Sequence, residues 1–464
     1  MNDLEPFVMA LKELGRIDLA KDVLDTFSTI ASNYEQYDNL AKCYFMLRLY
    51  SDSIKYSEHT LSLAASSQQF HTARANLINV YNHANYPEKA LRYISQSESV
   101  LPDDVDNLME KAYSLFLMND KQGAERILQG ALIKYPDLPE AIKIKIKFNL
   151  GTYYLYRDDF QTGLKLFLEE GAKLKFWKND NFIPNSVNNV FEKSNQKLKR
   201  EKYIKWDGSV VKGKPVVVDV EAGIGDEIIN FRFMKYIKEL GMVPYWFSSL
   251  KEREDLNAVF ARHGFNVVED LSLIKDDTIY YTQSMHLPIT LKLEYKDLWY
   301  GPYLGADQSY IDKWKWVKGS NKKSIGIRWQ GNPEYDQDLH RSYPLKQVLD
   351  LFEGKDVDLY SLQKDNGLEE MDSRIHDLSD KLETWDDTLA CIENLDYVIT
   401  SCTSIAHASA AMGKKTIILV PISAYYTWSH SGEQSPWYGD NVILLRQQKP
   451  RTWDEPIEKL KSLI

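Results

Sequence analysis

A glycine turn with an aspartate, directly after a run of β-branched residues, is the first segment of this chain that could do chemistry. Residues 215–220 read as a buried strand and are followed by Gly223-Ile224-Gly225-Asp226. The two glycines would let the backbone approach a ligand, and the start of the following helix favours an anion. A carboxylate at the carboxyl end of this strand could act as a general base, the candidates being Glu221, Asp226 and Glu227. N-terminal capping of the helix is the alternative role for each acid.

The second segment is a hydroxyl-rich turn that ends a strand predicted over residues 397–400. Three hydroxyl side chains precede or begin a helix with a small-residue face over 406–412: Ser401, Thr403 and Ser404. Together with the backbone amides of the helix start, they would surround an anion, and a diphosphate is the natural occupant. Simple capping of the helix by Ser or Thr is the alternative. His407 lies one turn inside the helix, where a packed core histidine is the common case.

Polar side chains also follow two other predicted strands. A tight turn after the strand 324–329 would place three side chains at the mouth of a cleft: Trp329, Gln330 and Asn332. Arg341 could clamp a phosphate or form a surface salt bridge. Gln363, which leaves the strand 357–362, could recognise a base edge or a ribose.

The motifs of several large enzyme classes are missing from the sequence. It has no HExxH, GxxxxGK[ST] or GxSxG, which excludes the commonest proteases, P-loop NTPases and serine hydrolases. Asp356-Val357-Asp358 matches a DxD metal motif only superficially, because it opens a strand without a second cluster of ligands, so no metal site is predicted. The three cysteines, Cys43, Cys391 and Cys402, form no CxxC pair, which suits a reducing compartment.

The elements that must position these residues alternate between strands and helices from residue 213 onward. Further strands are predicted over 243–247, 278–282 and 416–420, and helices over 226–240, 344–352, 385–394 and 404–412. Strands that alternate with helices imply parallel sheets. Two such sets predict two doubly wound, Rossmann-like domains that face each other across a cleft, over residues 213–308 and 309–464.

Residues 1–178 carry an internal repeat instead. Ala90 and Ala124 are 34 residues apart, and so are Pro102 and Pro136. Small residues at such positions let two antiparallel helices approach closely, and large ones such as Tyr44 fill the gap to the next hairpin. The pattern resembles the tetratricopeptide repeat in about five copies, an α-solenoid whose concave surface usually binds a protein or peptide. An ordinary helical bundle is the alternative.

A basic segment connects the two regions. Residues 179–212 are predicted as a linker that contains Lys193, Lys197, Lys199, Arg200, Lys202 and Lys205. They could form a solvated connecting helix or an electrostatic contact for an anionic substrate.

Composition limits the class of protein. The 464 residues include 44 % apolar and 12 % aromatic residues, too many for a disordered chain. The formal net charge of −10 disfavours a general nucleic-acid-coating role, although a small basic site is compatible with it. The start of the sequence lacks the features of a signal peptide and no stretch is apolar enough to span a bilayer, so a soluble, cytoplasmic protein is expected.

At these residues the chain resembles bacterial proteins that join tetratricopeptide repeats to a heptosyltransferase-like glycosyltransferase of the GT-B fold. The collinear matches cover roughly residues 215–450 and include Gly223-Ile224-Gly225-Asp226, Pro302-Tyr303-Leu304, Trp329-Gln330-Gly331-Asn332-Pro333, Arg341-Ser342, Ser361-Leu362-Gln363, Asp387-Thr388, Leu395-Asp396, Thr403-Ser404-Ile405-Ala406-His407, Ala411-Met412-Gly413-Lys414, Ser435-Pro436-Trp437-Tyr438 and Arg446-Gln447. The plan of repeats followed by a catalytic region is also similar to that of the protein O-GlcNAc transferases.

The resemblance implies an inverting transfer of a sugar from a nucleotide-diphosphate donor, without an obligatory metal or other cofactor. Asp226 matches the aspartate proposed as catalytic base in heptosyltransferases. Residues 213–308 would form the acceptor-side domain and 309–464 the donor-binding domain. The helix start at Thr403-Ser404 would stabilise the departing diphosphate, and three side chains would line the nucleotide-sugar side: Trp329, Gln363 and His407.

One position departs from the family pattern, and several functions therefore stay open. Many relatives carry an aspartate directly before the Thr-Ser pair, where this chain has Cys402. The leading hypothesis is a glycosyltransferase whose repeats position a protein or other macromolecular acceptor. The alternatives are transfer to a surface glycan or lipid, transfer to modified nucleic acid, and an inactive peptide-binding scaffold. A homodimer stays open, because repeat solenoids often pair.

Overall fold

A computed structural model describes residues 4–98, 105–178, 202–248, 253–319, 321–364 and 366–464. The chain forms two compact units. The first comprises Met1–Pro136 with Gln448–Arg451, and the second comprises Asp137–Gln447 with Thr452–Ile464. Pro102 and most of the basic segment, from Lys193 to Arg200, lie outside the described residues.

Helical hairpins make up the first unit. Its helices are α1 (Leu4–Glu13), α2 (Ile17–Ser28), α3 (Tyr34–Met46), α4 (Tyr50–Ser62), α5 (Ser67–His83), α6 (Pro87–Glu98), α7 (Val105–Leu117) and α8 (Lys121–Lys134). A fifth hairpin, α9 (Glu140–Tyr156) with α10 (Phe160–Lys178), belongs to the second unit. The succession of antiparallel hairpins confirms the predicted repeat architecture.

The sequence explains both the turns and the packing of these hairpins. Each hairpin turn contains one residue with a left-handed backbone: Gly15, Arg48, Asn85, Asn119 and Asp158, with φ between 61° and 69°. The predicted small residues Ala90 and Ala124 are fully buried, as is Tyr44. In the last hairpin a side chain at Gly163 would come within 2.9 Å of the carbonyl oxygen of Gly151, so glycine is needed for the close approach of α9 and α10.

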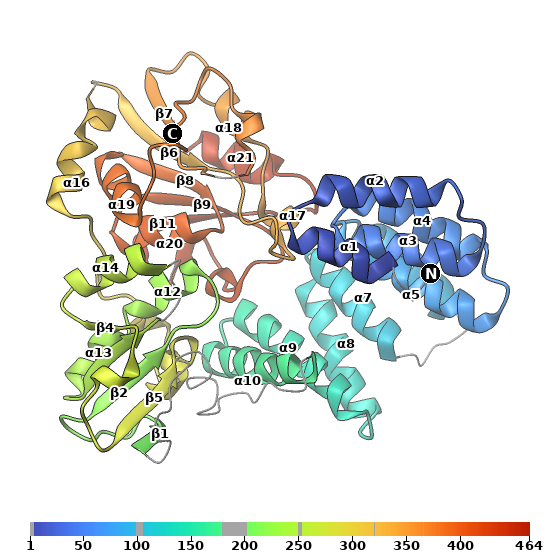
Figure 1. Cartoon of the computed structure of the whole chain (residues 1–464), viewed down its shortest axis with the longest axis horizontal. Coiled ribbons are helices and arrows are strands. Elements are labelled where there is room, and N and C mark those ends of the chain that lie inside the picture. Colours follow the sequence, from blue (N-terminus) through green and yellow to red (C-terminus); the bar gives the residue numbers. More distant parts are fainter. Residues whose placement is uncertain (1–3, 99–104, 179–201, 249–252, 320, 365) are drawn as a thin grey trace. The chain divides into compact units, whose positions relative to one another are not determined.

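The second unit contains two sheets in which parallel strands alternate with helices (Figure 1). The first sheet has the order β1-β5-β2-β3-β4 and is parallel throughout. Its strands are β1 (Tyr203–Lys205), β2 (Pro215–Asp219), β3 (Val243–Phe247), β4 (Asn266–Val268) and β5 (Ile279–Gln283). The helices of this part are α12 (Ile224–Phe231), α13 (Met234–Glu239), α14 (Glu254–Arg262) and α15 (Leu287–Thr290). The next helix, α16 (Gln308–Lys313), packs against the second sheet region.

The second sheet has the order β10-β11-β9-β8-β6-β7, and all its pairs except β10 with β11 are parallel. Its strands are β6 (Lys323–Arg328), β7 (Val357–Ser361), β8 (Tyr397–Ser401), β9 (Thr416–Val420), β10 (Gln434–Ser435) and β11 (Gly439–Arg446). The helices are α17 (Asp338–Arg341), α18 (Leu345–Asp350), α19 (Trp385–Asn394), α20 (Ser404–Ala411) and α21 (Asp454–Lys461). Two parallel-sheet regions after helical repeats confirm the predicted fold class.

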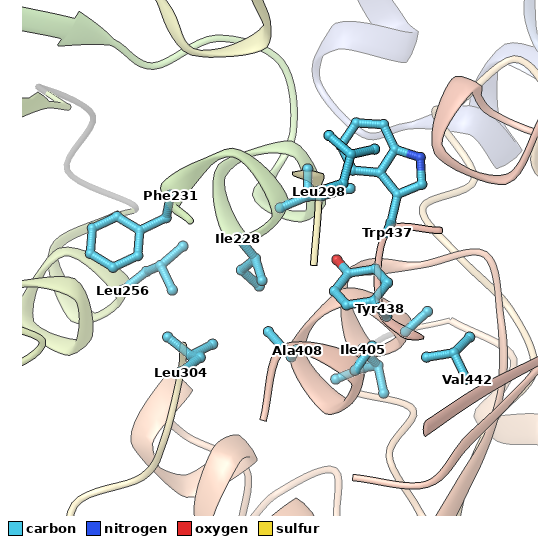
Figure 2. Packing of buried hydrophobic residues seen from close by; sticks show 14 of the residues in the cluster. Ile228, Phe231, Leu256, Leu298, Leu304, Ile405, Ala408, Trp437, Tyr438 and Val442 are labelled. Carbon is cyan, nitrogen blue, oxygen red and sulfur yellow. The ribbon is translucent and has the colours of Figure 1, made fainter. Parts of the chain in front are cut away.

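The two sheet regions share one apolar core. In Figure 2, Ile228 of α12 lies close to Ile405 and Ala408 of α20, with Trp437 and Tyr438 beside them. The helix predicted over 226–240 is interrupted after Phe231, and α13 resumes at Met234. None of the described helices combines the length and the apolar composition that a membrane crossing needs.

A buried arginine lies at the junction between the two sheet regions. Arg232, 1 % exposed, follows α12 and donates to the carbonyl oxygens of Ile229 (2.8 Å), Leu298 (2.9 Å) and Trp437. Its guanidinium lies 4.4 Å from the ring centroid of Tyr438. Carbonyl oxygens and an aromatic face thus replace water around this cation, and they come from segments on both sides of the junction.

Candidate functional site

The starts of two helices meet in the second unit. Helix α12 follows β2 of the first sheet and α20 follows β8 of the second, and the two helices pack against each other. A Cβ atom at Gly225 would lie 2.9 Å from Cδ2 of His407 and 3.6 Å from Cα of Ser404. The absence of a side chain at position 225 therefore permits this close packing, in addition to exposing backbone.

A cavity of about 640 Å³ opens at this meeting point. Apart from Glu221 and Glu227, the sequence singles out twelve candidate residues, and eight of them line this cavity: Gly223, Gly225, Asp226, Asn332, Arg341, Thr403, Ser404 and His407. Most of them lie in the turns after the carboxyl-terminal ends of strands in both sheets, which is where ligands bind in open parallel sheets.

Asp226 lies at the N-terminal turn of α12, and its side chain is half-buried. Its Oδ2 accepts a hydrogen bond from the backbone N–H of Gly223 at 3.1 Å, so the expected capping role is present. Burial raises the pKa of Asp226 to about 6, although hydrogen bonds from Gly223 and Tyr425 act in the opposite direction. A carboxylate with this pKa is mostly ionised at pH 7 and still basic enough to take a proton from a hydroxyl in a transition state.

The two neighbouring acids have other partners. Glu227 is fully buried, and its Oε1 accepts a hydrogen bond from Nε of Arg253 at 2.7 Å. Oε1 of Glu221 lies 3.7 Å from Nδ1 of His286. Of the three candidate bases, Asp226 lines the cavity.

Arginines supply positive charge to the cavity. Arg253, Arg328 and Arg341 all line it. Arg341 donates through Nη1 to the carbonyl oxygen of Cys402 at 2.8 Å and through Nε to Asp338 at 2.8 Å. Arg341 is therefore held beside the turn that begins α20, in a position to contact an anion bound there.

The start of α20 is open for such an anion. Thr403 is the N-cap residue but makes no side-chain hydrogen bond to the helix. Its hydroxyl lies 3.4 Å from that of Thr400. The first backbone amides of α20 are thus not capped by Thr403, and the helix dipole adds to their attraction for negative charge.

His407 is a neutral member of the cavity wall. Its Nδ1 lies 2.8 Å from the hydroxyl of Tyr438, and its ring stacks on Trp428 with centroids 4.8 Å apart. Burial, with a further contribution from Arg232, lowers the pKa of His407 to about 3. The imidazole is both packed, as a core histidine would be, and present at the cavity.

The other four residues lie behind the cavity wall. Trp329 and Ser401 are fully buried, Trp329 within the apolar core of the second sheet. Gln363 is also fully buried and accepts a hydrogen bond from the backbone N–H of Gln330 at 3.2 Å. The side chain of Gln330 donates to Glu370. These residues support the turn that carries Asn332.

Several cavity residues were not predicted. Arg253 is the N-cap residue of α14, Ser423 and Tyr425 lie in a loop, and Trp428 ends a short 3-10 helix; no pattern in the sequence pointed to these four residues. Arg328 could have been found, because a charged residue that ends an otherwise buried strand is unusual. Among the described residues, no three His, Cys, Asp or Glu side chains are grouped so that they could hold a metal ion.

Comparisons with known proteins give partial structural likenesses. No family model matches the chain, and no curated protein matches it. A glycosyl transferase of family 9 from Veillonella parvula is 11 % identical, with a TM-score of 0.36, over 52 % of this chain and 87 % of its own. The E. coli ADP-heptose lps heptosyltransferase II is 10 % identical, with a TM-score of 0.36, over 54 % of this chain and 98 % of its own.

A helical protein is among the matches as well. A thermophilic TPR protein of Thermus thermophilus is 17 % identical, with a TM-score of 0.27, over 39 % of this chain and 92 % of its own. Both kinds of protein that the sequence resembles are therefore among the solved structures to which parts of the chain are similar. At these TM-scores, a function can be assigned only from the arrangement of residues in the cavity.

Proposed function

We propose that this chain is an inverting, metal-independent glycosyltransferase that moves a sugar from a nucleotide-diphosphate donor to an acceptor hydroxyl. One observation carries the proposal: a half-buried carboxylate, an uncapped helix start and three arginines line the same cavity of about 640 Å³. A base on one side and an anion site on the other are what such a transfer requires.

Asp226 is the general base of this mechanism. Its carboxylate takes the proton of the acceptor hydroxyl while the oxygen attacks the anomeric carbon from the face opposite the leaving group. The bond from the anomeric carbon to the diphosphate breaks as the new glycosidic bond forms, so the configuration inverts. The nucleoside diphosphate leaves with the electron pair.

The start of α20 and the arginines receive the charge that develops on the diphosphate. Backbone amides and the hydroxyls of Thr403 and Ser404 donate hydrogen bonds to its oxygens, and Arg341 and Arg328 add positive charge. The anion site so formed is supplied entirely by the chain, which is the basis for proposing that no metal is obligatory. The nucleotide sugar is a substrate and no cofactor is assigned.

The helical hairpins of the first unit are assigned to acceptor binding. A pocket of about 300 Å³ lies among these hairpins, and its walls include Asp38 and Phe45 of α3 and Asn76 and Asn79 of α5. Amide and carboxylate side chains around an apolar floor can bind both the backbone and the side chains of a peptide. We therefore favour a protein or another macromolecule as the acceptor.

A binding screen tests the donor site. UDP, GDP, ADP, CMP and their common sugars are added to the purified chain, with and without EDTA, and the unfolding temperature is recorded. A ligand at about 100 times its dissociation constant stabilises the protein by about 2.7 kcal/mol, which gives a visible shift. We expect a shift with one nucleoside diphosphate, unchanged by EDTA.

Two arginine variants locate the bound nucleotide. Arg341→Ala should abolish most of the shift, because it removes a cavity charge. Arg374→Ala should retain it, because Arg374 is paired with Asp350 and Asp372 and does not line the cavity. If neither the original chain nor the control shows a shift, the proposal is refuted, and a shift unaffected by Arg341→Ala would place the nucleotide elsewhere.

A further inference from the structure

Tyr156, in the last turn of α9, is hydrogen-bonded to the loop 421–425, which lines the candidate donor cavity. Its hydroxyl donates to the carbonyl oxygen of Ile422 at 2.7 Å and accepts from the backbone N–H of Ala424 at 2.9 Å. Burial raises the pKa of Tyr156 to about 12, so the hydroxyl keeps its proton at neutral pH. Both hydrogen bonds are therefore maintained under the conditions in which an enzyme would work.

The residues that Tyr156 fixes alternate with those that line the cavity. Ile422 and Ala424 are held through their backbone, and Pro421, Ser423 and Tyr425 form part of the cavity wall. Any shift of the loop at 422 or 424 thus moves its neighbours at the cavity surface.

The second helix of the same hairpin supports the end of this loop. The ring of Phe167 on α10 lies 5.6 Å from that of Tyr426 and 6.1 Å from that of Tyr425, measured between centroids. Tyr425 in turn lines the cavity together with Asp226 and lowers the pKa of that carboxyl. A continuous series of contacts therefore leads from α9 and α10 to Asp226.

The hairpin is hydrogen-bonded to segments of both sheet regions. Asp158, in the hairpin turn, accepts from the backbone N–H of Ser431 at 3.0 Å. Gln161 at the start of α10 donates to the carbonyl oxygens of Leu293 and Pro288, which follow the first sheet. These contacts explain why the hairpin belongs to the second compact unit.

We propose that Tyr156 is a positioning residue for the donor site, which it serves by holding the loop 421–425 against the cavity. The inference rests on the proposed function, because it assigns to Tyr156 an effect on nucleotide binding and on Asp226. A helix with the sequence character of a repeat thus becomes a structural part of the transfer site.

The test is a Tyr156→Phe variant of the full chain, compared with Tyr154→Phe on the same helix. Tyr154→Phe is a matched control, because it also removes one hydroxyl from α9. The ring of Tyr154 contacts Arg157, with the guanidinium 4.4 Å from the ring centroid. Tyr156→Phe leaves the N–H of Ala424 without its acceptor, and we expect about tenfold weaker binding of the nucleoside diphosphate found in the screen. Calorimetry measures this binding directly.

A pH profile separates positioning from a loss of stability. If the loop moves, the Tyr425 hydroxyl moves away from Asp226 and no longer lowers the pKa of that carboxyl, so the acidic limb of kcat/KM moves to higher pH. The control variant should keep the original limb. Phe167→Leu keeps apolar volume but removes the ring contacts, and it should shift the acidic limb in the same direction. This second variant keeps the proposal testable if Tyr156→Phe does not fold.

The outcomes distinguish the two proposals. Unchanged nucleotide affinity and an unchanged acidic limb in Tyr156→Phe, in a chain that does bind nucleotide, would overturn the role of Tyr156 alone. A chain that binds no nucleotide at all would remove the proposed function and this inference together.

Discussion

Replacement of Asp226 by asparagine separates its proposed role as a base from its observed role as a cap. The asparagine side-chain oxygen can still accept from the N–H of Gly223, so the start of α12 should stay intact. A positioned general base contributes about 10²–10⁴-fold to a rate, and we expect turnover to fall by that factor in Asp226→Asn. Nucleotide affinity should change little, because the anion site that we propose lies at the start of α20.

The same substitution should stabilise the second unit at neutral pH. The folded pKa of Asp226 is about 6 against 3.8 for the ordinary group, so the folded state holds this proton more tightly than the unfolded state. Its stabilising contribution is complete below pH 3.8 and is lost as the pH rises through 6. One unit of pKa shift corresponds to about 1.4 kcal/mol, so the ionised carboxylate lowers the free energy of unfolding by at most about 3 kcal/mol at pH 7. Solvent around the half-buried group reduces this value. Asp226→Asn avoids that cost.

Turnover is followed as release of nucleoside diphosphate between pH 5 and 8, and stability as the unfolding temperature at pH 5 and 7.5. In the original chain, kcat/KM should fall about tenfold from pH 7 to pH 5 as Asp226 takes up a proton. Glu221→Gln is the control, because it removes a neighbouring charge that raises the pKa of Asp226 and should move the acidic limb to slightly lower pH. A general base should contribute far more than about threefold to the rate. If turnover of Asp226→Asn stayed within about threefold of the original, Asp226 would not be the base.

Two further predictions concern the helix junction. Gly225→Ala would bring a Cβ atom to 2.9 Å from His407, so α12 and α20 must separate; overpacking of this kind costs about 1–3 kcal/mol, and both the unfolding temperature and nucleotide affinity should fall. An unaltered unfolding temperature would show that the helices adjust freely. His407, whose pKa is about 3, should show imidazole NMR shifts that do not change between pH 5 and 8, and a titration near pH 6 would contradict its buried, neutral state.

The elements of the second unit were predictable where apolar runs are continuous. The bounds of β3 (Val243–Phe247), β9 (Thr416–Val420) and α19 (Trp385–Asn394) agree with the prediction, because continuous apolar or amphipathic patterns mark these elements in the sequence. β1 (Tyr203–Lys205) and β4 (Asn266–Val268) were not predicted, since three residues are too few to show a period.

Much of the site was predictable from the turns that follow strand ends. Asp226, Thr403 and Ser404 follow directly on β2 and β8, and all three line the cavity. Trp329 also follows a strand, yet its indole is fully buried in the core, because the direction in which a turn leaves the sheet depends on packing. Tyr425 lies in a loop held by a distant hairpin, and no local pattern in the sequence carries that information.

The buried guanidinium of Arg232 has a mechanical consequence. It is bonded at once to the end of α12 and to the carbonyl oxygens of Leu298 and Trp437. Sliding these segments apart by an ångström or two would strand a cation in apolar surroundings, so the junction is stiff. Ligands would then exchange through the mouth of the cavity and its loops, with little hinge opening. A stiff cavity also loses little conformational entropy when a ligand binds, so that few contacts can give tight binding.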